Sequence, residues 1–346
     1  MRFDPEHTLY LIDISSFIYR AYYAINRNLK NRKGEPTNAA YGVTTMLLKL
    51  INEVNPKYFG IVYDSKEPSF RKKIYNDYKA NRSAPPEDLI PQFDKIEAIV
   101  KAFDVFSIKQ GGTEADDLIA SLTHEWQAKS PKNMVIIVSS DKDLMQLVNA
   151  NVQLWDTLKD KFFGPKEVNE KFGVLPSQIR DYLSLVGDSS DNIPGVSGIG
   201  QKTAVALIQE FGSLKAILEA SQKNKITGKK AENIKNHQQD AQLSYELVGL
   251  RQESSCAISF EELKYEFHLT DACKQLFREL DFSSLLKKLE PKEDVKKGVS
   301  LDQHDIFKTI QKESELNALL EKLSQKGEFG FDLETTSLNP RKAEIV

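Results

Sequence analysis

Short apolar segments alternate with amphipathic segments from the N-terminus to about Thr157. The apolar segments predict five strands: Thr8–Ile14, Tyr58–Asp64, Val105–Ile108, Met134–Ser139 and Val152–Trp155. The stretches with helical spacing between them are Ala40–Asn52, Pro91–Phe103 and Asp116–Gln127. Strands that alternate with helices are typical of an α/β fold built on a parallel sheet.

The pattern changes after this region, and we expect four parts in the chain. Residues 1–164 form the α/β core, and residues 165–290 are mostly helical, with strand signal only at Cys256–Phe267. Residues 291–300 are polar and charged, as linkers are. Residues 301–346 predict a strand at Asp305–Ile310, a helix at Glu313–Lys326 and a strand-like GEFGFDLETT, which together read as a domain cut short.

The composition indicates the cellular compartment of the protein but leaves its binding partner open. The two cysteines, Cys256 and Cys273, have neither zinc spacing nor a disulfide pattern, which favours a reducing interior. We find no secretion signal and no membrane-spanning run, so a soluble, cytoplasmic protein is expected. The net charge of −3 leaves nucleic acid open as a partner, because the basic segments are separate from the acidic ones.

Acidic residues recur where predicted strands end and helices begin. Asp13, Asp64 and the pair Asp141 and Asp143 each follow a strand, and the carboxyl ends of parallel strands meet at one edge of the sheet. The other acidic residues lie in TEADD and in GDSSDNIPG, and they are Glu114, Asp116, Asp117, Asp188 and Asp191. So many carboxylates in one cleft repel one another unless cations are present. Oxygen ligands without paired Cys and His fit two Mg²⁺ or Mn²⁺ ions that cleave a phosphodiester.

Each acidic residue also has an ordinary structural explanation. Asp13 and Asp64 can be turn or N-cap residues, and Thr113 can cap a helix whose dipole the following acids complement. Asp188 and Asp191 can be turn formers before Pro194. The recurrence of acids at comparable positions in one α/β pattern favours a metal site.

Two segments are suited to holding phosphate. Gly195, Gly198 and Gly200 form a tight turn that leads directly into a helix beginning near Lys202 and Thr203. Glycines allow close backbone approach and a helix N-terminus presents free N–H groups, although a plain helix–turn–helix connection is the alternative. The segment FRKKIYNDYKANR interleaves basic and aromatic residues, as nucleic-acid grooves do, although a solvated basic helix face is the alternative. Its residues include Arg71, Tyr78, Lys79 and Arg82, and Arg20 is a weaker candidate for DNA contact.

These motifs together resemble the 5′ nuclease domain of bacterial DNA polymerase I, a relative of the flap endonucleases. The matching segments, in order, are LYLIDISSFIYRAYYA, VYDSKEPSFRKKIYNDYKANR, GTEADDLIA, SSDKDLMQLV and GDSSDNIPGVSGIGQKTA. The resemblance covers about the first 290 residues and implies a PIN-like nuclease core with a helical arch. It also implies a helix–three-turn–helix element that grips duplex DNA.

The resemblance assigns roles to individual residues. It implies that the first metal ion is held by Asp13, Asp64, Glu114 and Asp116, and the second by Asp141, Asp143 and Asp191, with Asp117 and Asp188 in support. Lys79 and Arg82 match residues that steer the scissile phosphate, and Tyr78 matches an aromatic at the substrate 5′ end. The Gly195–Gly200 turn matches a hairpin that in relatives often also holds K⁺.

The sequence departs from the family at Ile14, and its last residues resemble the start of a second domain. Ile14 stands where the family usually has glycine, which puts the close approach of the backbone near Asp13 in question. FDLETT resembles the first motif of the 3′→5′ proofreading exonuclease domain, with Asp332 and Glu334 as its metal ligands. Its other acidic motifs and a polymerase domain are missing, so neither activity is expected from these residues.

The expected function is therefore a monomeric 5′→3′ exonuclease and flap endonuclease. Its substrates are DNA with 5′ flaps, nicks or RNA–DNA primer junctions. One alternative is a PIN-like single-strand ribonuclease, which the Gly195–Gly200 turn argues against. The other is a DNA-structure-binding module without catalysis, which the complete acid set argues against.

Overall fold

The computed structural model describes residues 3–25, 28–252, 258–290 and 310–325, together with residues 328 and 330. These residues belong to two units, Met1–Leu289 and Glu290–Val346. In the described part of the chain, no helix is both long and apolar enough to cross a lipid bilayer.

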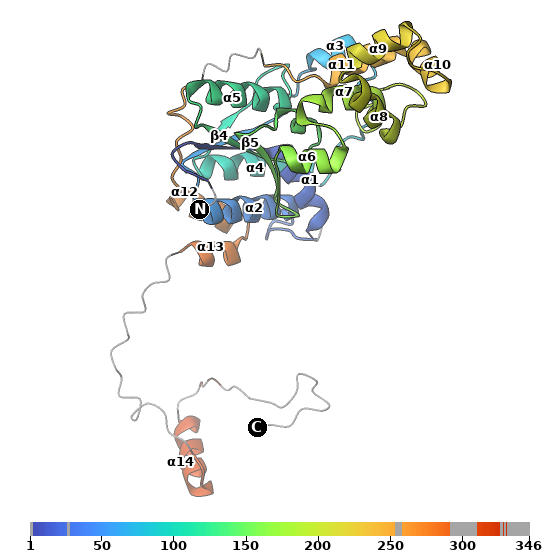
Figure 1. The fold of residues 1–346 in the computed structure, drawn as a ribbon. Helices are drawn as coiled ribbons and strands as arrows, with labels where there is room; N and C mark the ends of the chain where they lie inside the picture. The colour runs from blue at the N-terminus through green and yellow to red at the C-terminus, as the bar shows by residue number, and fades with distance from the viewer. Residues whose placement is uncertain are drawn as a thin grey trace. The chain divides into compact units, whose positions relative to one another are not determined.

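The first unit is built on a six-stranded sheet with the strand order β3-β2-β1-β4-β5-β6 (Figure 1). Its first five strands run parallel, and only β6 pairs antiparallel, with β5. The strands are β1 (Thr8–Asp13), β2 (Tyr58–Val62), β3 (Phe106–Ile108), β4 (Met134–Val138), β5 (Val152–Asp156) and β6 (Lys161–Phe163). The order reverses at β1, which lies between β2 and β4, and such a switch point is where ligands bind in open α/β sheets.

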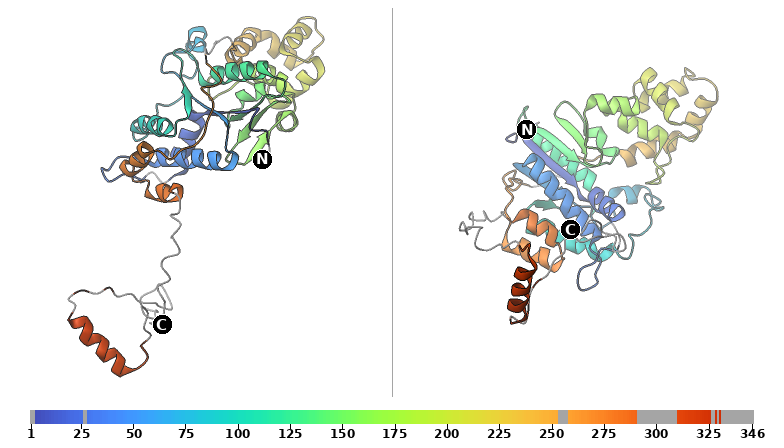
Figure 2. Two further views of the ribbon diagram at one scale, coloured as in Figure 1. Left: turned by 90° about the vertical axis from the view of Figure 1, so that its left-hand side faces the viewer. Right: turned by 90° about the horizontal axis from the view of Figure 1, so that it is seen from below.

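Both faces of the sheet are covered, which explains the unbroken apolar runs in the sequence. Alternate residues of β1 point to opposite faces, so Leu9 and Leu11 belong to one core cluster and Tyr10 and Ile12 to the other. The first cluster includes residues of α5 and of the later helices α7 to α11, and the second includes residues of α1, α2, α4, α12 and α13. Figure 2 shows α12 and α13, in orange, on the opposite side of the sheet from the yellow helices.

The helices follow the strands in an order close to that expected. Those that accompany the sheet are α1 (Ile14–Ala24), α2 (Asn38–Val54), α3 (Phe70–Ile74), α4 (Ile90–Ala102), α5 (Ala115–Lys129) and the 3₁₀ turn η1 (Asp143–Leu147). Those of the helical part are α6 (Pro165–Phe172), η2 (Pro176–Gln178), α7 (Ile179–Val186), α8 (Gln201–Phe211), α9 (Leu214–Gln222), α10 (Lys229–Asn236), α11 (Gln238–Val248), α12 (Asp271–Glu279) and α13 (Ser283–Leu289). In the second unit, α14 (Glu313–Ser324) matches the helix expected there.

Several expectations need correction. The strand expected at Cys256–Phe267 is wrong for its described residues, because only an isolated bridge from Lys264 to Tyr58 forms there. The expected helical arch contains one short helix, α3, followed by turns in the residues up to α4. The sequence pattern did not predict β6. The linker, the strand at Asp305–Ile310 except Ile310, and Asp332 and Glu334 lie outside the described residues.

A buried ion pair joins the sheet-side helices to the helical part. The Arg71 guanidinium, on α3, donates to both carboxylate oxygens of Asp117 on α5, at 2.6 and 2.9 Å. It also donates to the main-chain oxygens of Leu247 and Gly249 at the end of α11, and the Arg251 N–H donates to Asp117. Both side chains are at most 3% exposed. Removing one partner of such a pair leaves the other charge buried and unpaired.

We therefore expect Arg71→Ala to lower the free energy of unfolding by about 3–5 kcal/mol, because Asp117 loses its counter-charge and two carbonyl groups lose their donor. Urea denaturation measures this, with Lys73→Ala as the matched control because Lys73 is an exposed basic residue on the same helix. The control should change stability by no more than about 0.5 kcal/mol. Equal effects of the two variants would contradict the structural role of Arg71.

Candidate active site

A pocket of about 820 Å³ opens at the carboxyl ends of the central strands. Its acidic lining comes from separate elements: Asp13 ends β1, Asp64 follows β2, Asp116 lies in the first turn of α5 and Asp141 follows β4. Asp191 reaches the same pocket from the loop after α7. The predicted convergence of acids at one edge of the sheet is therefore present in the structure.

Serine hydroxyls and main-chain amides hold these carboxylates in place. Asp13 is the N-cap of α1, and its Oδ1 accepts from the N–H of Ser15 at 3.1 Å, while its Oδ2 accepts from the Ser139 hydroxyl at 3.0 Å. The Asp64 carboxylate accepts from the Ser15 hydroxyl at 2.9 Å and from the Ala115 N–H at 3.0 Å. The N-cap reading of Asp13 is thus correct, and it holds together with a place in the pocket.

Burial and mutual repulsion raise the pKa values of several acids. Burial, with the nearby charges of Asp64 and Asp141, raises the pKa of Asp13 to about 7. Burial and Asp141 raise the pKa of Asp143 to about 8. The pKa values of Asp116 and Asp141 are also raised, again mainly by burial. The protein by itself therefore disfavours full ionisation of this cluster.

The donor set fits a hard divalent cation. The acids that line the pocket offer carboxylate oxygens. Asp143, two residues after the lining residue Asp141, has a buried Oδ1 without a hydrogen-bond partner. An ion beside these groups would supply the missing partner and favour their charged forms. Among the described residues, no group of three Asp, Glu, His or Cys side chains is arranged closely enough to hold one ion.

Basic residues from the turns after α3 pair with Asp191, which lines the pocket, and with Glu114, the N-cap of α5, which is outside the lining. The Lys79 ammonium donates to Glu114 at 2.7 Å and lies 3.9 Å from Asp191, and the Arg82 guanidinium donates to Asp191. Burial raises the pKa of Glu114, but the charges of Lys79 and Arg71 outweigh it and lower that pKa below its usual value. Lys79 and Arg82 both line the pocket.

Tyr78 and Arg71 occupy positions that differ from those expected. Tyr78 is only 5% exposed, and its hydroxyl lies 3.1 Å from Glu114 and 3.3 Å from Asp191, so its ring is packed in the core instead of facing a groove. Arg71 does not face DNA, because its guanidinium is fully used in the buried pair with Asp117. Asp117 correspondingly has its oxygens committed to Arg71 and Arg251.

The loop before α8 has the expected tight turn. The φ angle of Gly195 is +63°, and a Cβ atom there would lie 2.5 Å from the main-chain nitrogen of Gly187. Gly200 is the N-cap of α8, so Lys202 and Thr203 lie in its first turn, and Gly198 also has positive φ. In the same loop, Asp188 pairs with Lys142 at 2.8 Å, which outweighs burial and lowers the pKa of Asp188.

Sequence reasoning missed Ser15, Ser139 and Lys142. Their signal is adjacency, because the serines stand in DISS and SSD, within two residues of predicted metal ligands, and Lys142 lies between Asp141 and Asp143. Ile14, which departs from the family's glycine, begins α1 and has its side chain buried in the core. Arg20 lines the pocket and bonds Thr157 at 2.8 Å.

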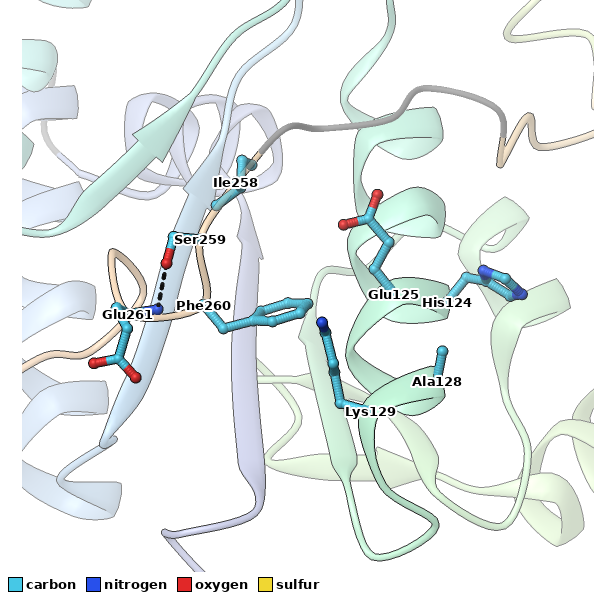
Figure 3. Close-up of a pocket in the computed structure, with 8 residues that line it drawn as sticks. All are labelled: His124, Glu125, Ala128, Lys129, Ile258, Ser259, Phe260 and Glu261. Atoms are coloured by element: carbon cyan, nitrogen blue, oxygen red, sulfur yellow. Dashed lines mark hydrogen bonds between the residues drawn. The ribbon is translucent and has the colours of Figure 1, made fainter.

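A second pocket, of about 610 Å³, lies between α5 and residues 258–261 (Figure 3). The Lys129 ammonium lies 5.6 Å from the centre of the Phe260 ring, whereas His124, Glu125 and Glu261 point in different directions (Figure 3). Because its ionisable groups do not converge, this pocket is a poorer candidate for chemistry than the acidic one.

Comparison with known proteins agrees with this geometry. A family described as 5′-3′ exonuclease, N-terminal resolvase-like domain, matches residues 8–173, and its partner, 5′-3′ exonuclease, C-terminal SAM fold, matches residues 174–270. A 5′-3′ exonuclease of Aquifex aeolicus is 40% identical over 82% of this chain and 95% of its own length. A DNA polymerase I of Rhizobium leguminosarum is 40% identical over 81% of this chain, which spans only 28% of that relative.

Solved structures show the same fold. The bacteriophage T5 5′-exonuclease with bound zinc is 21% identical, with a TM-score of 0.59, and the match covers 81% of this chain and 99% of that one. A T5 flap endonuclease in complex with DNA and metal ions has a TM-score of 0.60 at 21% identity, over 81% of this chain and 99% of its own. With an acidic pocket on the sheet edge, two matching family descriptions and relatives at 40% identity, the chain belongs to the 5′-3′ exonuclease family.

Proposed function

We propose that this chain removes 5′ ends and flaps from DNA by hydrolysis at a pair of Mg²⁺ or Mn²⁺ ions held in the acidic pocket. The observation that carries the proposal is a set of buried carboxylates with raised pKa values: Asp13, Asp116 and Asp141 line one pocket, and Asp143 follows Asp141 by two residues. Repulsion among such groups is a cost to the metal-free protein, and divalent cations relieve it.

We assign the carboxylates to two sets. Asp13, Asp64, Glu114 and Asp116 form the first, and Asp141, Asp143 and Asp191 form the second. When bound, such ions activate a water molecule and stabilise the leaving oxygen. Asp188 supports the second set through Lys142, and Asp117 supports the first through Arg71.

The basic residues of the pocket then position the substrate. Lys79 and Arg82 stand beside the carboxylates and orient the scissile phosphate by charge-assisted hydrogen bonds. The Gly195–Gly200 turn and the first turn of α8, with Lys202 and Thr203, hold a phosphate of the duplex, and a K⁺ ion is a further ligand for that turn. Arg20, Lys79 and Arg82 contact DNA at or beside the pocket.

The substrates that we propose are DNA with 5′ flaps, nicks and RNA–DNA primer junctions. The protein acts as a monomer in the bacterial cytoplasm. A single-strand ribonuclease has no need of the turn before α8, and a non-catalytic binder has no need of a complete acid set. Cleavage of a 5′-labelled flap duplex and of single-stranded RNA, each with Mg²⁺ and with EDTA, distinguishes the three.

We expect Asp64→Asn and Asp141→Asn each to reduce flap cleavage by at least about 100-fold, because each removes a ligand, and even changes beyond the ligands cost 10–100-fold at metal sites. The matched control is Asp94→Asn, since Asp94 also lines the pocket but is in neither set. Cleavage rates at saturating DNA and Mg²⁺ measure the effect. Full activity in either ligand variant would refute the metal assignment.

The raised pKa values also predict how stability depends on pH. Folding favours the protonated forms of Asp13 and Asp143, so their contribution to stability is complete below the ordinary pKa near 4 and is lost as the pH rises through about 7 and 8. Without divalent ions, the Tm should therefore fall between pH 6 and pH 8.5. Mg²⁺ should raise the Tm more at the higher pH, because it binds the ionised form of the folded protein.

Differential scanning fluorimetry with EDTA or Mg²⁺ measures both effects. Asp143→Asn is the matched variant, because an amide of the same shape cannot ionise, and it should flatten the pH dependence of the metal-free protein. A metal-free Tm that rises over this range would contradict the electrostatic account of the pocket.

A further inference from the structure

Lysines from two neighbouring elements gather beside the acidic pocket. Lys159 and Lys161 belong to the β5–β6 hairpin, and Lys171 lies in the last turn of α6. The ammonium groups of Lys161 and Lys171 lie 5.1 and 5.0 Å from the centre of the same ring, that of Phe163. Lys171 also lies 5.0 Å from the centre of the Phe172 ring. Aromatic faces therefore hold these two cations on one small surface, which with Lys159 we call the hairpin patch.

The charges of the hairpin patch act on one another. Burial lowers the pKa of Lys171, and the charges of Lys159, Lys161 and Lys142 lower it further, against a single opposing contribution from Asp156. Asp156 is buried and already shared between Arg20, at 3.6 Å, and Lys159, at 4.0 Å. Among the described residues, no carboxylate forms an ion pair with Lys161 or Lys171, so the hairpin patch has excess positive charge.

The neighbouring acids are occupied elsewhere. The Asp160 carboxylate accepts from the Trp155 indole at 3.2 Å, and the Glu167 carboxylate accepts from the Gly164 N–H at 3.0 Å, although Lys161 also lowers the pKa of Glu167. Lys142 is paired with Asp188. Lys161 and Lys171 are therefore available to bind an anionic partner outside the chain.

The hairpin patch adjoins the pocket. Arg20 lines the pocket and its guanidinium donates to the hydroxyl of Thr157, in the turn of the hairpin, at 2.8 Å. On the other side, the charge of Lys142 contributes to the lowered pKa of Lys171. Lys142 lies between Asp141 and Asp143 in the sequence. Figure 1 shows α6 beside β5, between the sheet and the helices α7 and α8. The hairpin patch therefore lies beside the pocket, just beyond the carboxyl end of β5.

We propose that the hairpin patch binds the phosphate backbone of a double-stranded segment next to the cleavage point. This inference rests on the proposed function, and it names a part of the substrate. Lysines without arginine forks or amide groups give contact to phosphate without reading sequence. The rings favour a duplex over a single strand, because stacking of unpaired bases needs free aromatic faces. Here Phe163 is only 5% exposed, and both rings already carry ammonium groups.

The test is the double variant Lys161→Gln/Lys171→Gln, with fluorescein-labelled nicked duplex DNA as the probe and EDTA present to prevent cleavage. Each lost phosphate contact should reduce the slope of log Kd against log salt by about 0.9, so the slope should fall by about 1.8. The Kd should rise about tenfold at moderate salt. The matched control is Lys166→Gln: Lys166 is an exposed lysine on α6 that pairs with Glu170 at 3.8 Å, and its Kd should change less than twofold.

Two further measurements define the inference. The Kd for a single-stranded oligonucleotide of the same length should change less than twofold in the double variant. Cleavage of nicked DNA at saturating concentration with Mg²⁺ should stay within twofold of wild type, because the hairpin patch lies outside the carboxylate sets.

Three results would overturn the proposal: an unchanged Kd and slope for the nicked duplex, an equal loss in the Lys166→Gln control, or an equal loss on single-stranded DNA. Failure of the proposed function looks different, since wild-type protein would then bind DNA but not cut it. Circular dichroism of the double variant should match that of wild type, because both substituted lysines are exposed.

Discussion

Electrostatic repulsion among carboxylates at one edge of a parallel sheet governs much of this structure. Parallel strands place their carboxyl ends together, so acids that are far apart in the sequence, such as Asp13, Asp64 and Asp141, arrive at one pocket. Burial raises the pKa values of Asp13, in the pocket, and of Asp143, which follows Asp141. Each neighbouring cation or donor can be understood by how it offsets that repulsion.

The chain offsets acidic charge in two physically different ways. Around Asp117 the compensation is permanent, because Arg71 meets both carboxylate oxygens and the pair is sealed from water while it also joins α3, α5 and the end of α11. Around Glu114 and Asp191 the cations are Lys79 and Arg82, which are partly exposed and line the pocket. Only the second kind of cation remains accessible to a substrate.

The elements that the sequence predicted best are those with one dominant signal. Apolar runs buried on both faces predicted the five parallel strands, and the acids after them predicted the composition of the pocket. The short antiparallel β6 was missed because three residues carry little pattern. The apparent strand near Phe260 is instead a segment whose aromatic ring packs on Trp126, at 5.1 Å between ring centres. Periodicity does not distinguish these two ways of burying apolar residues.

Basic residues were harder to place than acidic ones. In FRKKIYNDYKANR, the letters do not tell which cation is buried and which faces the pocket, since that depends on tertiary partners such as Asp117 and Leu247. The same limit applies to Ser15 and Ser139, whose roles arise from strands that meet only in the fold. The resemblance to a family assigned the acids to two metal ions. The hydrogen-bond partners of each side chain could be identified only from the structure.

The proposed function requires that the acidic pocket hold protons that divalent cations displace. Isothermal titration of the protein with Mg²⁺ in two buffers of different ionisation enthalpy measures that exchange directly. With Asp13 near pKa 7 and Asp143 near pKa 8, binding at pH 7 should release more than one proton, and the release should fade toward pH 9.5. Mg²⁺ binding without proton release across this range would contradict the account.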